Sequence, residues 1–339
     1  MNLITGATGL VGTHLAIELI EKGKDVRCIY RDDKKLLLVK EVMEFYHPGN
    51  GETIFNNIEW VKGDILDIES LNEAMEDVDV VYHCAAVISF GQYSADLVYK
   101  VNVEGTTNIV NLCIEHNINK LCHISSSAAV GKHPYNGILY ASEKTKWKKS
   151  NNNTDYSISK YNSEKEVWRG IEEGLEAVIL NPCVILGPGD WKKGSLQMFK
   201  TISEGLKFYT SGGNGFIDAR DVAKTAFHMS EKGIISEKFL LVSENLYFKE
   251  IFDMIAKEFN IKAPNIKAGQ PITEIAWRIE AIRSFFTSNT PSITKESTRS
   301  AHKTVVFDNK KIKEELGYEF IPVEESIGNA CEFFKRFYA

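Results

Sequence analysis

The stretch Leu3-Ile4-Thr5-Gly6-Ala7-Thr8-Gly9-Leu10-Val11-Gly12 decides the fold of this 339-residue chain. An apolar run ends at Ile4, and glycines follow at positions 6, 9 and 12. From Leu10 to Ile20 the apolar residues recur at helical spacing, and Gly23 supplies a C-terminal cap. The pattern predicts a strand, a glycine turn and a helix.

Each glycine of this turn has a physical role in dinucleotide binding. Gly6 suits a tight turn, Gly9 lets backbone amides approach a pyrophosphate, and Gly12 lets the helix pack closely on the strand. The helix N-terminus then offers free N–H groups and a partial positive charge to an anion. The alternative is a plain structural turn, because glycine is common in any tight turn.

The rest of the first half alternates strands with helices. We expect further strands over 25–30, 58–62, 78–84, 120–124 and 177–180. Helices are predicted over 36–46, after Asp67, over 94–116 and over 154–173, with loops at 47–57 and 132–153. This alternation predicts an α/β fold of the Rossmann type, a doubly wound parallel sheet with right-handed crossovers.

The regular alternation of strands and helices ends after residue 186. We expect a dinucleotide-binding domain over 1–186 and a smaller, mostly helical substrate-binding region over 187–339, parts of which return to the main sheet. Helices are predicted over 195–204, 247–259, 270–287 and 323–338, with another opening at Phe216-Ile217-Asp218-Ala219-Arg220-Asp221-Val222-Ala223. A last strand is predicted over 239–242.

Composition narrows the class of protein. A net charge of −6 argues against a general nucleic-acid binder, and no apolar run is long enough to span a membrane. The cysteines are scattered, so we expect reduced, buried thiols. The histidines form no ligand pair, so we expect no metal. Because the glycine turn begins so early, we expect no signal peptide. We therefore expect a cytoplasmic protein with a small-molecule substrate.

Charges after the second strand bear on the choice of coenzyme. A carboxylate there binds a ribose 2′-hydroxyl, whereas a cation accommodates a 2′-phosphate. Arg31 comes first, with Lys34 and Lys35 close behind, which favours NADP. Asp32 keeps NAD open, and a solvated run of charges is the alternative interpretation.

Chemistry is expected where strands five and six end, at Ser125-Ser126-Ser127 and Asn181-Pro182. Between them, Tyr156 and Lys160 are four residues apart and share a helix face. At ~4 Å and an effective dielectric of about 20, an ammonium attracts a phenolate by about 4 kcal/mol, which is about three pKa units before desolvation. We therefore expect Lys160 to lower the pKa of Tyr156, which makes the tyrosine a proton donor, while a serine hydroxyl stabilises the substrate oxygen.

Together these motifs resemble the extended short-chain dehydrogenase/reductase superfamily, of the NAD-dependent epimerase/dehydratase type. The resemblance implies Ser127, Tyr156 and Lys160 as the catalytic trio, with Ser125 or Ser126 sharing the substrate oxygen. It also implies that Lys160 holds the nicotinamide ribose. The coenzyme site expected from the glycine turn, Arg31 and the resemblance comprises Gly6, Thr8, Gly9, Leu10, Val11, Gly12, Arg31, Asp64, Ile65, Ala85, Ala86, Asn102, Ser125, Tyr156, Lys160, Pro182 and Val184.

Three short stretches of the sequence distinguish members of this superfamily. The dehydratases follow the serine with an acid and a base, whereas this chain has Ala128 and Ala129. Many epimerases place an arginine where this chain has Asn214 and Gly215, so one expected diphosphate ligand is missing. Arg220 instead resembles the dihydroflavonol-reductase and hydroxysteroid-dehydrogenase-like members.

The resulting hypothesis is an NADP-dependent oxidoreductase that reduces a carbonyl, or oxidises the alcohol, of a small to medium, partly apolar substrate. Trp277, Phe285 and Phe286 either line an apolar substrate cleft or belong to the core. One alternative is a nucleotide-sugar 4-epimerase with retained NAD. Another is a non-enzymatic NADP-binding regulator, against which the intact serine, tyrosine and lysine argue. A homodimer is compatible with the sequence, which does not determine the oligomeric state.

Overall fold

The computed structural model describes residues 1–88, 93–150, 153–274, 277–278, 298, 300–317 and 319–338. A seven-stranded sheet with the strand order β12-β8-β5-β4-β1-β2-β3 forms its centre. All neighbouring strands of this sheet run parallel. The strands are β1 (Asn2–Thr5), β2 (Val26–Tyr30), β3 (Ile58–Lys62), β4 (Val80–His83), β5 (Lys120–Ile124), β8 (Ala177–Pro182) and β12 (Glu237–Leu241).

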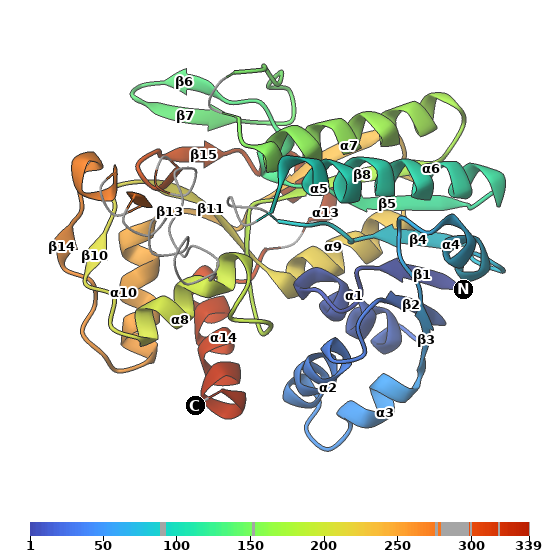
Figure 1. The fold of residues 1–339 in the computed structure, drawn as a ribbon, viewed down its shortest axis with the longest axis horizontal. Coiled ribbons are helices and arrows are strands. Elements are labelled where there is room, and N and C mark those ends of the chain that lie inside the picture. The colour runs from blue at the N-terminus through green and yellow to red at the C-terminus, as the bar shows by residue number, and fades with distance from the viewer. Residues whose placement is uncertain are drawn as a thin grey trace.

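Helices cover both faces of this sheet, as the predicted doubly wound fold requires (Figure 1). One layer contains α1 (Leu10–Glu21), which packs on α9 (Ala219–Glu231). The other layer contains α6 (Gly105–Glu115), which packs on α7 (Asp155–Glu172). Apolar strand residues are buried against each layer, for example Ile4 on the first side and Leu3 on the second. The predicted α/β architecture is therefore confirmed.

The expected helix over 94–116 contains a change of helical type. It consists of α5 (Ala95–Tyr99), a π-helical turn η1 (Lys100–Glu104) and α6. A π turn inserts an extra residue and often marks a functional position. Here it includes Asn102, whose amide exchanges two hydrogen bonds with the backbone of Val87, at 2.7 and 3.0 Å. The π turn therefore helps to hold the segment that follows β4.

Two expected loops contain regular structure. Within 47–57 the chain forms α3 (Gly51–Asn56), which follows α2 (Lys35–Tyr46) and buries Ile54 and Phe55. Within 132–153 it forms a hairpin of β6 (His133–Tyr135) and β7 (Ile138–Ala141). The strand β15 (Val305–Phe307) pairs with β7, so a distant segment stabilises this excursion.

The helix expected to open at Phe216 begins later. Residues 213–218 form β11 (Gly213–Asp218), and α9 starts at Ala219, after Asp218 accepts a hydrogen bond from Arg220 N. The strand pairs with β9 (Val184–Leu186) and with β13 (Glu244–Tyr247). These pairings bury Phe216 and Ile217 and so override their helical spacing.

The described C-terminal part contains mostly helices, and it also adds β12 to the edge of the main sheet and α9 to one of its helical layers. The remaining elements are α4 (Ile68–Ala74), η2 (Ser127–Ala129), η3 (Gly194–Leu196), α8 (Gln197–Ser203), β10 (Phe208–Tyr209), α10 (Phe248–Glu258), β14 (Ile266–Lys267), α13 (Lys310–Leu316) and α14 (Val323–Phe337). Most of the helix predicted over 270–287, including Phe285 and Phe286, lies outside the described residues. Among the helices in the described ranges, none has the length and apolar character needed to cross a bilayer.

Candidate active site

The glycine turn joins β1 to α1 in close contact with the segment after β4. Gly6 has a φ of +68°, and a Cβ there would lie 2.6 Å from Ala85 N. A Cβ on Gly12 would lie 2.7 Å from Ala7 Cα. Gly9 is exposed and caps α1 without a side-chain hydrogen bond, and the first turn of α1 has no acidic residue. The turn therefore presents backbone N–H groups in a cradle that fits a phosphate.

The residues expected at the adenosine end lie beyond β2 and β3. Arg31 pairs with Asp64, with 3.2 Å between Nη1 and Oδ2. Ile65 is buried where a Cβ on Gly105 would meet its side chain. Burial lowers the pKa of Lys35, and the positive charges of Lys193 and Arg31 lower it further. Three cations thus gather on this side of the turn, and Lys193 comes from the C-terminal half of the chain.

Helix α7 positions the expected tyrosine and lysine. Its first turn is capped by Thr154, whose Oγ1 accepts a hydrogen bond from Ser157 N at 3.1 Å. Lys160 is 2% exposed, and its Nζ donates to Ile124 O at 2.9 Å. Burial lowers the pKa of Lys160 to about 8, although the Glu164 carboxylate opposes this shift. The ammonium is therefore held at the carboxyl end of β5.

The expected lowering of the tyrosine pKa is wrong for this arrangement. Burial raises the pKa of Tyr156, and a hydrogen bond with Ser126 lowers it in part. The ammonium of Lys160 instead contacts a backbone carbonyl. The phenol therefore keeps its proton at neutral pH, which suits a proton donor better than a proton acceptor.

The three serines after β5 point to different partners. Ser125 donates from Oγ to Glu164 Oε1 at 2.6 Å, so it belongs to a buried network. Ser126 contacts the Tyr156 hydroxyl, whereas Ser127 contacts the Cys183 thiol. The structure thus places a hydrogen bond between Ser126 and the tyrosine, and the catalytic role expected of Ser127 stays a prediction.

The other expected coenzyme residues surround the same edge of the sheet. Ala85 and Ala86 follow β4, Pro182 ends β8, and Val184 begins β9. Asn102 is 2% exposed and donates to Ser159 Oγ at 2.9 Å. The Asn102 amide therefore supports the site indirectly, through Ser159 of α7.

Sequence reasoning missed the buried polar groups beneath Lys160. His83 binds Thr5 and Thr106 through its two ring nitrogens, at 2.7 and 3.0 Å, and its ring lies 5.2 Å from that of His123. Burial lowers the pKa of His83 to about 3, and the charge of Lys160 contributes. Burial also lowers the pKa of His123, so both imidazoles are neutral at neutral pH. The pairing of β4 with β5, which aligns these two residues, is not visible in sequence spacing.

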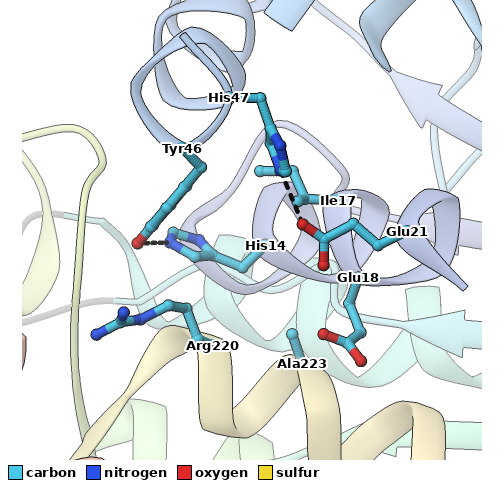
Figure 2. A pocket seen from close by; sticks show the side chains of 8 residues that line it. All are labelled: His14, Ile17, Glu18, Glu21, Tyr46, His47, Arg220 and Ala223. Carbon is cyan, nitrogen blue, oxygen red and sulfur yellow. Dashed lines mark hydrogen bonds and ion pairs between the residues drawn. The ribbon is translucent and has the colours of Figure 1, made fainter. Parts of the chain in front are cut away.

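A cavity of about 170 Å³ lies between α1, α2 and α9. Four of its polar side chains form two pairs: His14 Nε2 lies 3.1 Å from the Tyr46 hydroxyl, and His47 Nε2 lies 2.8 Å from Glu21 Oε1 (Figure 2). None of the expected site residues lines it. The active-site candidate is therefore the sheet edge and not this cavity.

Comparison with known proteins shows the family to which the chain belongs. The profile of the NAD dependent epimerase/dehydratase family matches residues 2–240. The chain is 25% identical to Sterol demethylase protein B of Methylococcus capsulatus, over 98% of both chains. It is 26% identical to a putative dihydroflavonol 4-reductase of Synechocystis, over 98% of this chain and 94% of the relative. A cinnamoyl-CoA reductase of Petunia hybrida is 25% identical, over 96% of this chain and 89% of its own.

Solved structures share the fold over the whole length. The crystal structure of gox2253 has a TM-score of 0.81 and 29% identity, and the match covers 100% of this chain and 98% of that one. A UDP-glucose 4-epimerase from Thermotoga maritima has a TM-score of 0.76 at 18% identity, over 100% of both chains. The chain belongs to the NAD-dependent epimerase/dehydratase family of the extended short-chain dehydrogenase/reductase superfamily, and it is an NAD(P)-dependent enzyme.

Proposed function

We propose that this enzyme reduces a carbonyl of a small to medium, partly apolar substrate with NADPH, and oxidises the alcohol in the reverse direction. The observation that carries the proposal is that the Tyr156 hydroxyl hydrogen-bonds Ser126, while Lys160, one turn further along α7, holds its buried ammonium at Ile124 O, at the carboxyl end of β5. Ligands of open parallel sheets collect at this edge.

The residues of the glycine turn fit the coenzyme. Backbone N–H groups of Leu10 and Val11, at the start of α1, would hold the pyrophosphate, and Lys160 would hold the nicotinamide ribose. When bound, the reduced nicotinamide supplies a hydride to the carbonyl carbon. Arg31, with Lys35 and Lys193 nearby, would bind the 2′-phosphate, because the positive charges of all three side chains act on the same place. This is the basis for proposing NADP.

The proton comes from this chain. Tyr156 donates its phenolic proton to the carbonyl oxygen as that oxygen gains negative charge. Ser126 donates a hydrogen bond to the same oxygen, and the Lys160 ammonium stabilises the negative charge that develops beside it. One hydride and one proton convert the carbonyl to an alcohol, so the reaction balances without a metal.

The test is a screen of NADPH oxidation over aldehydes, ketones and flavanonols, with NADH in parallel. The proposal expects turnover with at least one carbonyl class and a preference for NADPH. A nucleotide-sugar 4-epimerase would instead release tightly retained NAD when the purified protein is denatured. Retained NAD with no carbonyl turnover would therefore overturn the proposal.

A further inference from the structure

Glu164 lies one helical turn beyond Lys160 on α7 and is 3% exposed. Burying a carboxyl group is costly unless hydrogen bonds compensate for the lost water. Its Oε1 accepts a hydrogen bond from Ser125 Oγ at 2.6 Å and another from Asn181 Nδ2 at 2.5 Å. Both lone-pair directions of this oxygen are therefore used.

The two donors come from different strands. Ser125 follows β5, and its backbone N donates to Leu180 O at 2.7 Å. Asn181 lies near the end of β8, and its Nδ2 also donates to Ser126 O at 2.9 Å. Through these hydrogen bonds, the Glu164 carboxyl group links the serine turn, residues 125–127, to α7, which also carries Tyr156.

The charged groups around this carboxyl come from two elements, β12 and α7. Lys238 of β12 places Nζ 4.0 Å from Glu164 Oε2, and Lys160 precedes it on α7. Burial raises the pKa of Glu164, and these two lysines oppose the shift. Lys160 in turn faces Glu164 and Cys84, together with the neutral rings of His83 and His123.

We infer that Glu164 is a positioning residue, which holds the Ser126 hydroxyl against Tyr156 by clamping Ser125 and Asn181. The inference rests on the proposed carbonyl reduction. Glu164 acts through its neighbours: the serine turn keeps its place relative to α7 because one buried acceptor binds donors from β5 and β8.

The test compares Glu164→Ala with Glu164→Gln. Alanine removes the acceptor, so kcat is expected to fall about 10–100-fold, as for other residues that orient a site through their neighbours. The solvent isotope effect on kcat is expected to rise, because proton donation by Tyr156 becomes misaligned. Glutamine keeps an acceptor oxygen and is expected to restore kcat to within about five-fold.

The pH profile separates positioning from a general loss of folding. Because the Glu164 carboxylate raises the pKa of Lys160, Glu164→Gln is expected to move the alkaline limb to lower pH. Glu166→Gln is the matched control, since Glu166 lies on the same helix and pairs with Arg169 near solvent. In this control variant, kcat, the solvent isotope effect and the alkaline limb of the pH profile are expected to equal those of the wild type.

If Glu164→Ala does not fold, Ser125→Ala removes one donor without emptying the site, and it is expected to lower kcat about 3–10-fold. Wild-type kcat and isotope effect in the folded Glu164→Ala variant would overturn the inference and leave the carbonyl reductase intact. If the wild type reduces no carbonyl, the proposed function fails. A crystal structure of Glu164→Ala then decides the inference, and a retained Ser126–Tyr156 hydrogen bond overturns it.

Discussion

The ammonium of Lys160 donates a hydrogen bond to the backbone carbonyl of Ile124, with 2.9 Å between Nζ and O. Burial lowers the pKa of this lysine to about 8. The cation is therefore present below that pH and is lost as pH rises through it. Tyr156 stays protonated over the same range, because burial raises the pKa of its phenol.

Carbonyl reduction is accordingly expected to be nearly constant at neutral pH and to fall as pH rises through the pKa of Lys160. The measurement is kcat/KM for NADPH oxidation as a function of pH. Lys160→Met is expected to be much less active and to lack this limb. A wild-type profile that stays flat until the usual lysine pKa, about 10.4, would show that the ammonium is not held as described.

A matched pair of serine variants tests which hydroxyl shares the substrate oxygen. Because Ser126 contacts Tyr156 and Ser127 contacts Cys183, Ser126→Ala is expected to lower kcat by about 10–100-fold and Ser127→Ala by less than about five-fold. Steady-state kinetics of both variants, with NADPH affinity measured by fluorescence, makes the comparison. A larger loss in Ser127→Ala would instead favour the assignment that the superfamily resemblance implies.

The coenzyme preference depends on Arg31. Removing a cation from a phosphate site typically costs about 1.5–3 kcal/mol, so Arg31→Ala is expected to raise the Kd for NADPH about 10–100-fold and to leave the Kd for NADH nearly unchanged. Lys22→Ala is the control, because this lysine lies at the other end of α1 beside Glu18. Equal losses for both coenzymes would contradict the 2′-phosphate assignment.

Stability should depend on pH through Asp221. Its side chain is 3% exposed and accepts a hydrogen bond from Ile321 N at 2.8 Å, and burial raises its pKa from 3.8 to about 6. Between those values the folded state keeps a proton that the unfolded state releases. The free energy of unfolding is therefore expected to fall by about 3 kcal/mol as pH rises across this window.

Urea unfolding over the same window measures this change, and Asp221→Asn supplies the comparison. The asparagine has an oxygen that still accepts from Ile321 N, and it does not titrate. Residue 221 is then expected to contribute nothing to the pH dependence of the free energy of unfolding. The variant should therefore lose less stability than the wild type as pH rises. Identical slopes for the two proteins would contradict the assigned shift.

The parallel sheet was predictable because its strands carry continuous apolar runs, such as the one ending at His83. The helix α3 was not predictable from Pro48, Gly49 and Asn50, which are typical of loops. That helix depends on tertiary contacts: Ile54 is buried, and Glu44 accepts hydrogen bonds from the backbone N of the glycines at positions 49 and 51. Local sequence carries no signal for such contacts.

The site was predictable to the extent that helix spacing determines it. Tyr156 and Lys160 share a face because they are four residues apart, and Glu164 could have been found by the same rule. The direction of the Lys160 ammonium depends on the carbonyl of Ile124. The hydrogen bonds of Glu164 to Ser125 and Asn181 depend on the pairing of β5 with β8. Sequence spacing along α7 contains neither relationship.

The most direct test of the account is the oxidation of NADPH by Tyr156→Phe with the best carbonyl substrate of the screen. Phenylalanine keeps the ring and removes the proton donor, so kcat is expected to fall by about 10²–10⁴-fold while the Kd for NADPH stays within about two-fold of wild type. Turnover by Tyr156→Phe equal to that of the wild type would contradict the claim that this phenol delivers the proton.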